Sequence, residues 1–246
     1  MNSILTEDMT VKDIVVRFQQ TREALETLGI DYCCGGKIPL YEAAQHAGLS
    51  VHRVLTDLTQ ALEGTNQEAA AVGDWNSVSL TELVDHIEHT HHVFMKEQLP
   101  RLSGLLNKTI QAHGIKHGKM LERLKYDHSA LRTDIEMHLE KEEQILFPLI
   151  RQMEAFQHGR GPALEMHCGS IANPIHQMEY EHDVAGRFLA QMRHISDDYT
   201  LPDEACPTFT ALFEGLAALE KDLHEHIHLE NNILFPKAED LERLSR

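Results

Sequence analysis

Two segments of the sequence repeat one another, and this repeat constrains the fold more than any other feature. Residues 138–148 read HLEKEEQILFP, and residues 226–236 read HIHLENNILFP. A histidine, a glutamate and the run Ile-Leu-Phe-Pro therefore coincide at a shift of 88 residues, while His92 and His182 upstream repeat at a shift of 90. We expect two related helix pairs, arranged about a pseudo-twofold axis.

Each copy of the repeat places a histidine four residues before a glutamate, as His138 with Glu142 and His226 with Glu230. Four residues make about one helical turn, so the two side chains share a face, and this is also the apolar face. It carries Leu131, Ile135, Ile145 and Leu149 in the first copy and Leu212, Leu216, Leu219, Leu223 and Ile233 in the second. An unpartnered imidazole or carboxylate in a core costs free energy that metal coordination relieves, so the pattern predicts a buried metal site.

Further histidines lie on the other two expected helices. His182 falls on the apolar stripe of the third helix. In the first helix, ideal geometry places His91 nearest the centre of the stripe and His92 at its edge, so periodicity leaves the choice between them open. Glu143 should point about 100° away from Glu142 around its helix. The other histidines in this part of the chain are expected in solvent or around the ligands: His86, His89, His113, His117 and His128.

Apolar residues recur at steps of three and four through most of the chain, and alternating strand patterns are missing. We predict an all-α protein whose main domain, residues 79–246, is an up-down-up-down four-helix bundle. Its helices are expected at roughly 79–113, 119–156, 173–196 and 207–240. A small helical domain over residues 1–62 should hold three short helices, which begin after Thr10, near Tyr41 and after Ser50, and residues 63–78 should be a linker.

The composition excludes several classes of partner. Lysine and arginine total 22 against 39 acidic residues, and the net charge of -17 repels phosphate backbones and anionic membranes. No apolar stretch approaches the ~20 residues of a membrane span, and the first residues lack the features of a secretory signal. We therefore expect a cytoplasmic protein that binds neither nucleic acid nor membranes. Of its four cysteines, Cys33 and Cys34 are neighbours, which suits a reducing compartment better than a disulfide framework.

Taken in order, these motifs resemble those of a known family, the hemerythrin-like iron-sulfur cluster repair di-iron proteins, also described as the repair of iron centres family. The resemblance runs end to end. It rests on the two repeat copies and on Asp31-Tyr32-Cys33-Cys34-Gly35-Gly36, Glu97-Gln98-Leu99-Pro100 and Glu181-His182-Asp183 with Gly186. The chain departs from the family's shorter members in the loop from His158 to Pro174, which adds His167 and Cys168.

The resemblance implies a hemerythrin-like bundle that holds two iron ions, bridged by carboxylate and oxo groups. Carried over by position, the six ligands are His92, His138, Glu142, His182, His226 and Glu230, so the resemblance favours His92 over His91. Imidazole and carboxylate also suit zinc, copper or manganese, so the residues alone do not name the metal. No catalytic residue is identified beyond this ligand set.

By resemblance, the protein would repair, or supply iron to, iron-sulfur clusters damaged by nitric oxide or oxidative stress. Its clients would be damaged iron-sulfur proteins, and its small ligand nitric oxide or oxygen. A reversible oxygen or nitric oxide carrier or sensor, a nitric oxide reductase activity at the same site, and a metal-stabilised interaction module stay open as alternatives. Cys33 and Cys34 are candidates for redox control or client contact, against the plain alternative of a glycine-flanked turn. True turnover, the electron donor and a homodimer are left open by the sequence.

Overall fold

The structure is a computed structural model that describes residues 4–33, 35–64, 75–161 and 169–244. These residues form helices and the loops between them, with one isolated antiparallel bridge between Thr10 and Pro39, so the predicted all-α class is confirmed. Two compact units are present: Met1–Val78 with Ile227–Pro236, and Ser79–His226 with Lys237–Arg246. None of the described helices combines the length and apolar character needed to cross a membrane.

The first unit contains short helices connected by tight loops. They are α1 (Val11–Arg17), the 3-10 helix η1 (Gln19–Thr21), α2 (Arg22–Thr27), α3 (Leu40–His46) and α4 (Val51–Gly64). Thr10 caps α1, because its hydroxyl accepts a hydrogen bond from the backbone N–H of Asp13 at 3.0 Å. The sequence predicted three helices here and missed α2, which has six residues and buries only Leu25, too little for a periodic signal. The predicted linker lies mostly outside the described residues.

The segment Ile227–Pro236 belongs to this first unit through its contacts. The side-chain amide of Asn231 donates to the carbonyl of Cys33 at 3.2 Å, and that of Asn232 donates to the carbonyl of Tyr32 at 3.0 Å. Both bonds are buried. Asn231 and Asn232, the two residues after Glu230, therefore hold the backbone at Tyr32 and Cys33. Cys34 lies outside the described residues.

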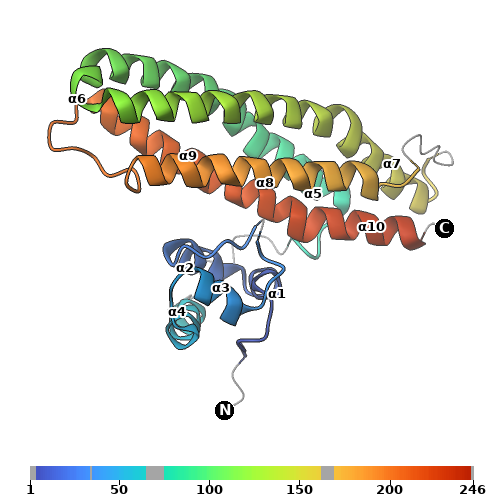
Figure 1. Ribbon diagram of the computed structural model, residues 1–246. Coiled ribbons are helices and arrows are strands. Elements are labelled where there is room, and N and C mark those ends of the chain that lie inside the picture. The colour runs from blue at the N-terminus through green and yellow to red at the C-terminus, as the bar shows by residue number, and fades with distance from the viewer. Residues whose placement is uncertain (1–3, 34, 65–74, 162–168, 245–246) are drawn as a thin grey trace. The chain divides into compact units, whose positions relative to one another are not determined.

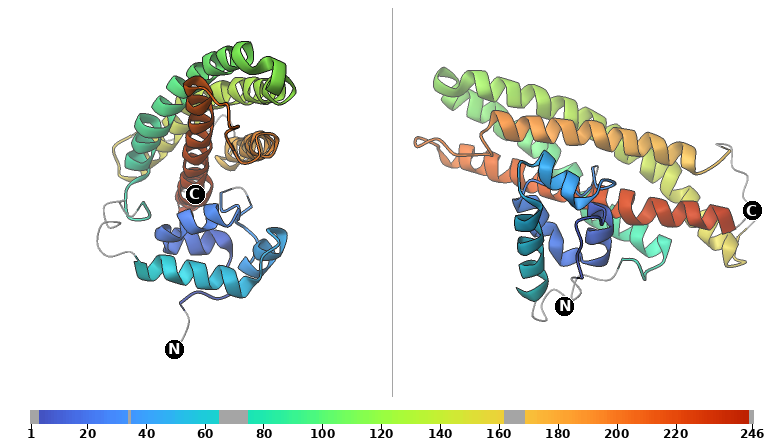
Figure 2. Two further views of the ribbon diagram at one scale, coloured as in Figure 1. Left: turned by 90° about the vertical axis from the view of Figure 1, so that its left-hand side faces the viewer. Right: turned by 60° about the horizontal axis from the view of Figure 1, so that its bottom comes forward.

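The second unit is built from long helices that run side by side (Figures 1 and 2). The helices of this part of the chain are α5 (Leu80–Ile87), η3 (Glu88–His92), α6 (Val93–Lys141), η4 (Glu142–Leu146), α7 (Phe147–Gln157), α8 (Ala172–Ile195) and α9 (Pro207–Leu229). The last of these continues through η5 (Glu230–Leu234) into α10 (Phe235–Leu244), and its segment Ile227–Pro236 is the part that belongs to the first unit. The helix α6 folds back on itself, since Arg132 donates to the hydroxyl of Ser103 at 3.3 Å, whereas 29 residues of straight helix would span about 44 Å. Its two legs thus correspond to the first two helices expected from the sequence.

Three π-helical turns, η3, η4 and η5, interrupt the helices described in this part of the chain. A π turn closes its hydrogen bond one residue later than an α turn, so the buried face moves forward by one position. After η4, Leu146 and Phe147 are buried while Ile145 is 61% exposed. The predicted core position of Ile145 is therefore wrong, and Leu149 is only half-buried, because ideal periodicity does not include the extra residue.

The start of α5 depends on a carboxylate from another helix, and this contact can be tested. Glu154 of α7 accepts hydrogen bonds from the backbone N–H groups of Leu80 and Thr81 at 2.8 and 3.0 Å. Glu154→Ala should lower the free energy of unfolding by about 1–2 kcal/mol. Each kcal/mol should lower the melting temperature by about 2–4 °C. The melting temperature would be measured by circular dichroism, with the exposed residue Gln152, changed to alanine, as the control. Equal melting temperatures would contradict this capping role.

The same contact predicts a pH dependence. Burial would raise the pKa of Glu154, but its bonds to Thr81 and Leu80 outweigh burial and lower it. A carboxylate with a lowered folded-state pKa stabilises the protein fully above its unfolded-state pKa, and this contribution is lost as the pH falls through the folded value. The difference between the native protein and Glu154→Ala should therefore shrink on acidification.

Candidate metal centre

Six buried side chains gather into two overlapping groups of potential metal ligands. The groups are His92, Glu142, His226 and Glu230, and His138, Glu142, His182 and Glu230. In each group, one donor atom from every residue lies within 4.8 Å of the others. All six residues are at most 1% exposed. These are the six residues predicted from the sequence, and both carboxylates belong to both groups.

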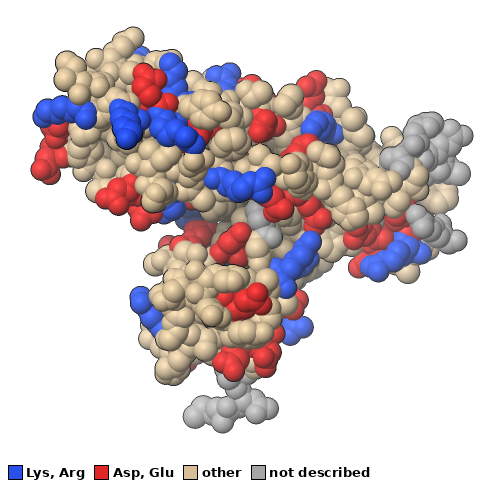
Figure 3. Space-filling view, viewed as in Figure 1, with Lys and Arg blue, Asp and Glu red and all other residues tan. Residues whose placement is uncertain are grey.

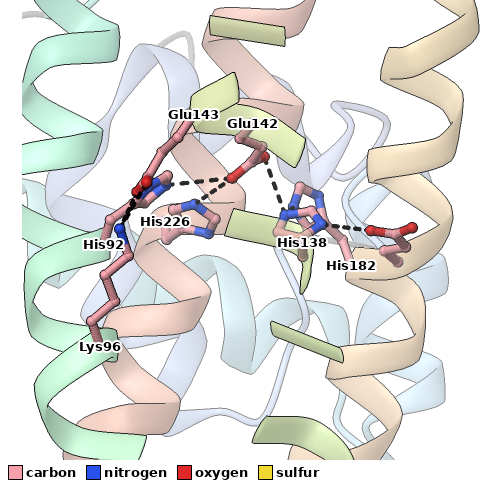
Figure 4. A network of polar contacts seen from close by, with 8 residues as sticks. His92, Lys96, His138, Glu142, Glu143, His182 and His226 are labelled. Atoms are coloured by element: carbon pink, nitrogen blue, oxygen red, sulfur yellow. Dashed lines mark hydrogen bonds and ion pairs between the residues drawn. The ribbon is translucent and has the colours of Figure 1, made fainter. Parts of the chain in front are cut away.

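Outer carboxylates determine which nitrogen of two of these rings faces the centre (Figure 4). Nδ1 of His92 lies 2.8 Å from Glu143, and Nδ1 of His138 lies 2.9 Å from Glu181. An ionised carboxylate only accepts hydrogen bonds, so Nδ1 carries the proton in both rings. Nε2 of each neutral ring is then left with a bare lone pair, which is the form that coordinates a metal.

The inward-facing nitrogen and oxygen atoms lie close to one another. Nε2 of His138 lies 3.0 Å from Nε2 of His182 and 3.1 Å from Oε1 of Glu142. Nε2 of His92 lies 3.4 Å from the other oxygen of Glu142. Neither Glu142 oxygen has a hydrogen bond of normal geometry among the described residues. Lone pairs held this close together repel one another unless a cation lies between them, so the donor set fits metal ions.

The electrostatics of Glu142 point to the same conclusion. Burial alone would raise the pKa of this carboxyl group, but His138, His226 and His92 hold it well below its usual value. Without a metal, that stabilisation requires protonated imidazoles, whereas a bound cation would supply the positive charge and leave the rings free to coordinate. The carboxylate is therefore ionised in the core, where it needs a permanent positive partner.

The outer carboxylates are the residues that sequence reasoning missed. Glu143 also accepts from Lys96 at 2.6 and 2.8 Å, and Glu181 accepts from Lys141 at 2.5 Å. The hydrogen bond from His138 is the main reason that the pKa of Glu181 falls to about 2. Glu143 and Glu142 both contact the ring of His92, Glu143 at Nδ1 and Glu142 at Nε2. The sequence did contain a signal for the outer carboxylates, because Glu143 directly follows the predicted ligand Glu142 and Glu181 directly precedes the predicted ligand His182.

The structure also separates His91 from His92. Both are buried, because η3 makes two consecutive residues face inward, but only His92 belongs to a ligand group. The expectation for His128 is wrong in part: it is fully buried, and burial lowers its pKa to about 4. His86 is half-buried and His89 is exposed, while His113 and His117 pack against Phe209.

The fold and the site together define a protein of the hemerythrin type. The family described as the hemerythrin HHE cation binding domain matches residues 83–238, and a domain of unknown function, DUF542, matches residues 7–62.

The full-length relatives are more specific. The iron-sulfur cluster repair protein YtfE of Enterobacter sp. (strain 638) is 36% identical over 231 residues, which cover 94% of this chain and 96% of the relative. The proteins of the same name from Citrobacter koseri and from Escherichia coli O81 (strain ED1a) are 35% and 36% identical over the same shares. The chain belongs to this family of hemerythrin-like iron-sulfur cluster repair proteins.

The contact between Glu143 and His92 predicts a measurable effect on metal affinity. Glu143→Ala removes the partner that orients His92, so metal affinity should fall by about 10–100-fold while the helices remain folded. The affinity would be measured by competition with a chelator, using Fe²⁺ under anaerobic conditions. Gln144→Ala, an exposed neighbour, is the control and should bind metal like the native protein. An unchanged affinity in Glu143→Ala would show that this contact does not support the ligand.

Proposed function

We propose that this protein is a di-iron protein that repairs iron-sulfur clusters damaged by nitric oxide or oxidative stress, and that it does so by supplying iron. One observation carries the proposal: two ligand groups share Glu142 and Glu230, and each adds two histidines of its own. This arrangement suits two ions held by separate imidazoles and bridged by common carboxylates. The names of the full-length relatives support the repair role.

The donor set suits ferrous iron that must be both held and released. Four neutral imidazoles and two carboxylates balance only part of the charge of two divalent ions. Ferritin-type sites in helical bundles use more carboxylates, with a Glu-x-x-His spacing, whereas this site is richer in neutral donors. Neutral donors favour the ferrous over the ferric state, because they stabilise the higher charge less. Six ligands for two ions also leave positions for solvent or a small gas molecule.

The proposal also covers where the protein works and with what. Damaged iron-sulfur proteins would be its clients. The cytoplasm would be its compartment, because ferrous iron and free thiols persist in a reducing environment. Cys33 is buried, and its thiol lies 3.3 Å from a carboxylate oxygen of Asp31. A direct role of this thiol in client contact would therefore require the motif to open first.

Removing either shared carboxylate should abolish the function. The native protein should hold close to two irons per chain, while Glu142→Ala and Glu230→Ala should each lose most of both, because each residue belongs to both groups. Iron would be measured by elemental analysis, and recovery of a nitric-oxide-damaged [4Fe–4S] enzyme by its returning activity. Glu140→Ala, an exposed residue on α6, is the matched control.

Two results would overturn parts of this proposal. One tightly held zinc and no iron after expression with ample iron would end the di-iron assignment. Full iron content with no cluster recovery, together with a reversible optical change on adding nitric oxide or oxygen, would assign gas binding to the centre instead.

A further inference from the structure

His91 has the structural marks of a metal ligand but belongs to neither ligand group. It is 2% exposed, and its Nδ1 lies 3.0 Å from a carboxylate oxygen of Asp222 on α9. Its Nε2 is buried and has no hydrogen-bond partner within the part of the chain that the structure describes. A buried ring nitrogen left in this way costs free energy, so a group from outside the chain is needed to satisfy it.

The same arrangement occurs at two of the ligands. His92 and His138 each direct Nδ1 at a carboxylate and Nε2 toward the metal centre. The carboxylate of Asp222 fixes the tautomer of His91 in the same way and leaves Nε2 as a bare lone pair. A histidine that only filled space in the core would not need an orienting carboxylate and an unused nitrogen. His91 is therefore prepared to coordinate a cation.

The spacing of the rings places His91 between the centre and a less buried histidine. Its ring centroid lies 6.1 Å from that of the ligand His226 and 5.6 Å from that of His86. Ring pairs within the ligand set are 4.7–6.2 Å apart, for example 4.7 Å between His138 and His182. Both neighbours of His91 are thus at distances over which one ion can pass between two imidazoles.

The surroundings of this histidine pair favour a divalent cation. Burial is the main cause that lowers the pKa of the half-buried His86, so its ring is neutral and able to bind a metal at pH 7. Glu225 also acts electrostatically on His86, and the second carboxylate oxygen of Asp222 is buried. Negative charge beside neutral imidazoles attracts cations without holding them as firmly as the centre does.

We propose that His91 is an auxiliary iron ligand, through which Fe²⁺ passes between His86 and the two-iron centre. The inference rests on the proposed function, in which iron is the cargo. In each step the ion exchanges one imidazole or water ligand for another, with no change in oxidation state. Because His91 is in neither group of four, it is a transfer ligand and not a permanent one.

The test separates the rate of iron exchange from the amount of iron bound. Protein loaded anaerobically with Fe²⁺ is mixed with a coloured ferrous chelator, and iron release is followed by absorbance. His91→Phe should still bind close to two irons at equilibrium but release and take up iron about tenfold more slowly. Asp222→Asn, which keeps the ring but weakens its orientation, should slow exchange less. His89→Phe is the control, because His89 is an exposed neighbour whose Nδ1 lies 2.7 Å from the carbonyl oxygen of Asp85.

Two outcomes would overturn the proposal. Native exchange rates in His91→Phe would show that iron takes another route. Loss of half or more of the bound iron in both His91→Phe and the better-matched His91→Gln, with unchanged circular dichroism, would make His91 a permanent ligand. Cluster recovery is measured separately on the native protein, so failure of the repair function and failure of this route give different results.

Discussion

The structure depends on the burial of two carboxylates among four imidazoles. Glu142 and Glu230 are fully buried, and Glu142 has three histidine nitrogens within 3.8 Å. An isolated ionised carboxylate in a core is strongly unfavourable, and neutral rings whose protons point outward do little to offset it. Metal ions between these groups would convert a repulsive cluster into an attractive one. The helices can then bring charged residues together where a core normally excludes them.

Much of the surrounding structure serves to prepare these donors. The outer carboxylates accept hydrogen bonds from Nδ1 of His92 and of His138. Lys96 (Figure 4) and Lys141 in turn donate to these carboxylates. Basic and acidic side chains are also intermixed over the visible face of this unit (Figure 3), although the overall charge of the chain is -17. The proton positions that make a ring nitrogen available are therefore fixed from outside the centre, by charges that remain partly in water.

The π turns give this site its local geometry. In η3 the extra residue makes His91 and His92 both face inward, which supplies one ligand and one neighbouring base from adjacent positions. In η4 and η5 the π turn begins at the glutamate of the repeat. The wider turn is a recurrent feature of functional sites in helices, and here it occurs at three of the ligand positions.

The sequence by itself determined the helical class, the repeat and five of the six residues that the structure gathers together, while the sixth, His92, came from the family resemblance. It could do so because a four-residue step fixes a shared helical face whatever surrounds the helix. Only the tertiary structure decided that Ile145 faces outward, that Glu143 and Glu181 contact the ligands, and that His92 and not His91 belongs to a ligand group. Those features depend on an added residue in a turn and on contacts between different helices. The periodicity of one helix cannot predict the added residue, because it assumes a constant number of residues per turn. It cannot predict the contacts either, because it contains no information about the side chains of the neighbouring helix.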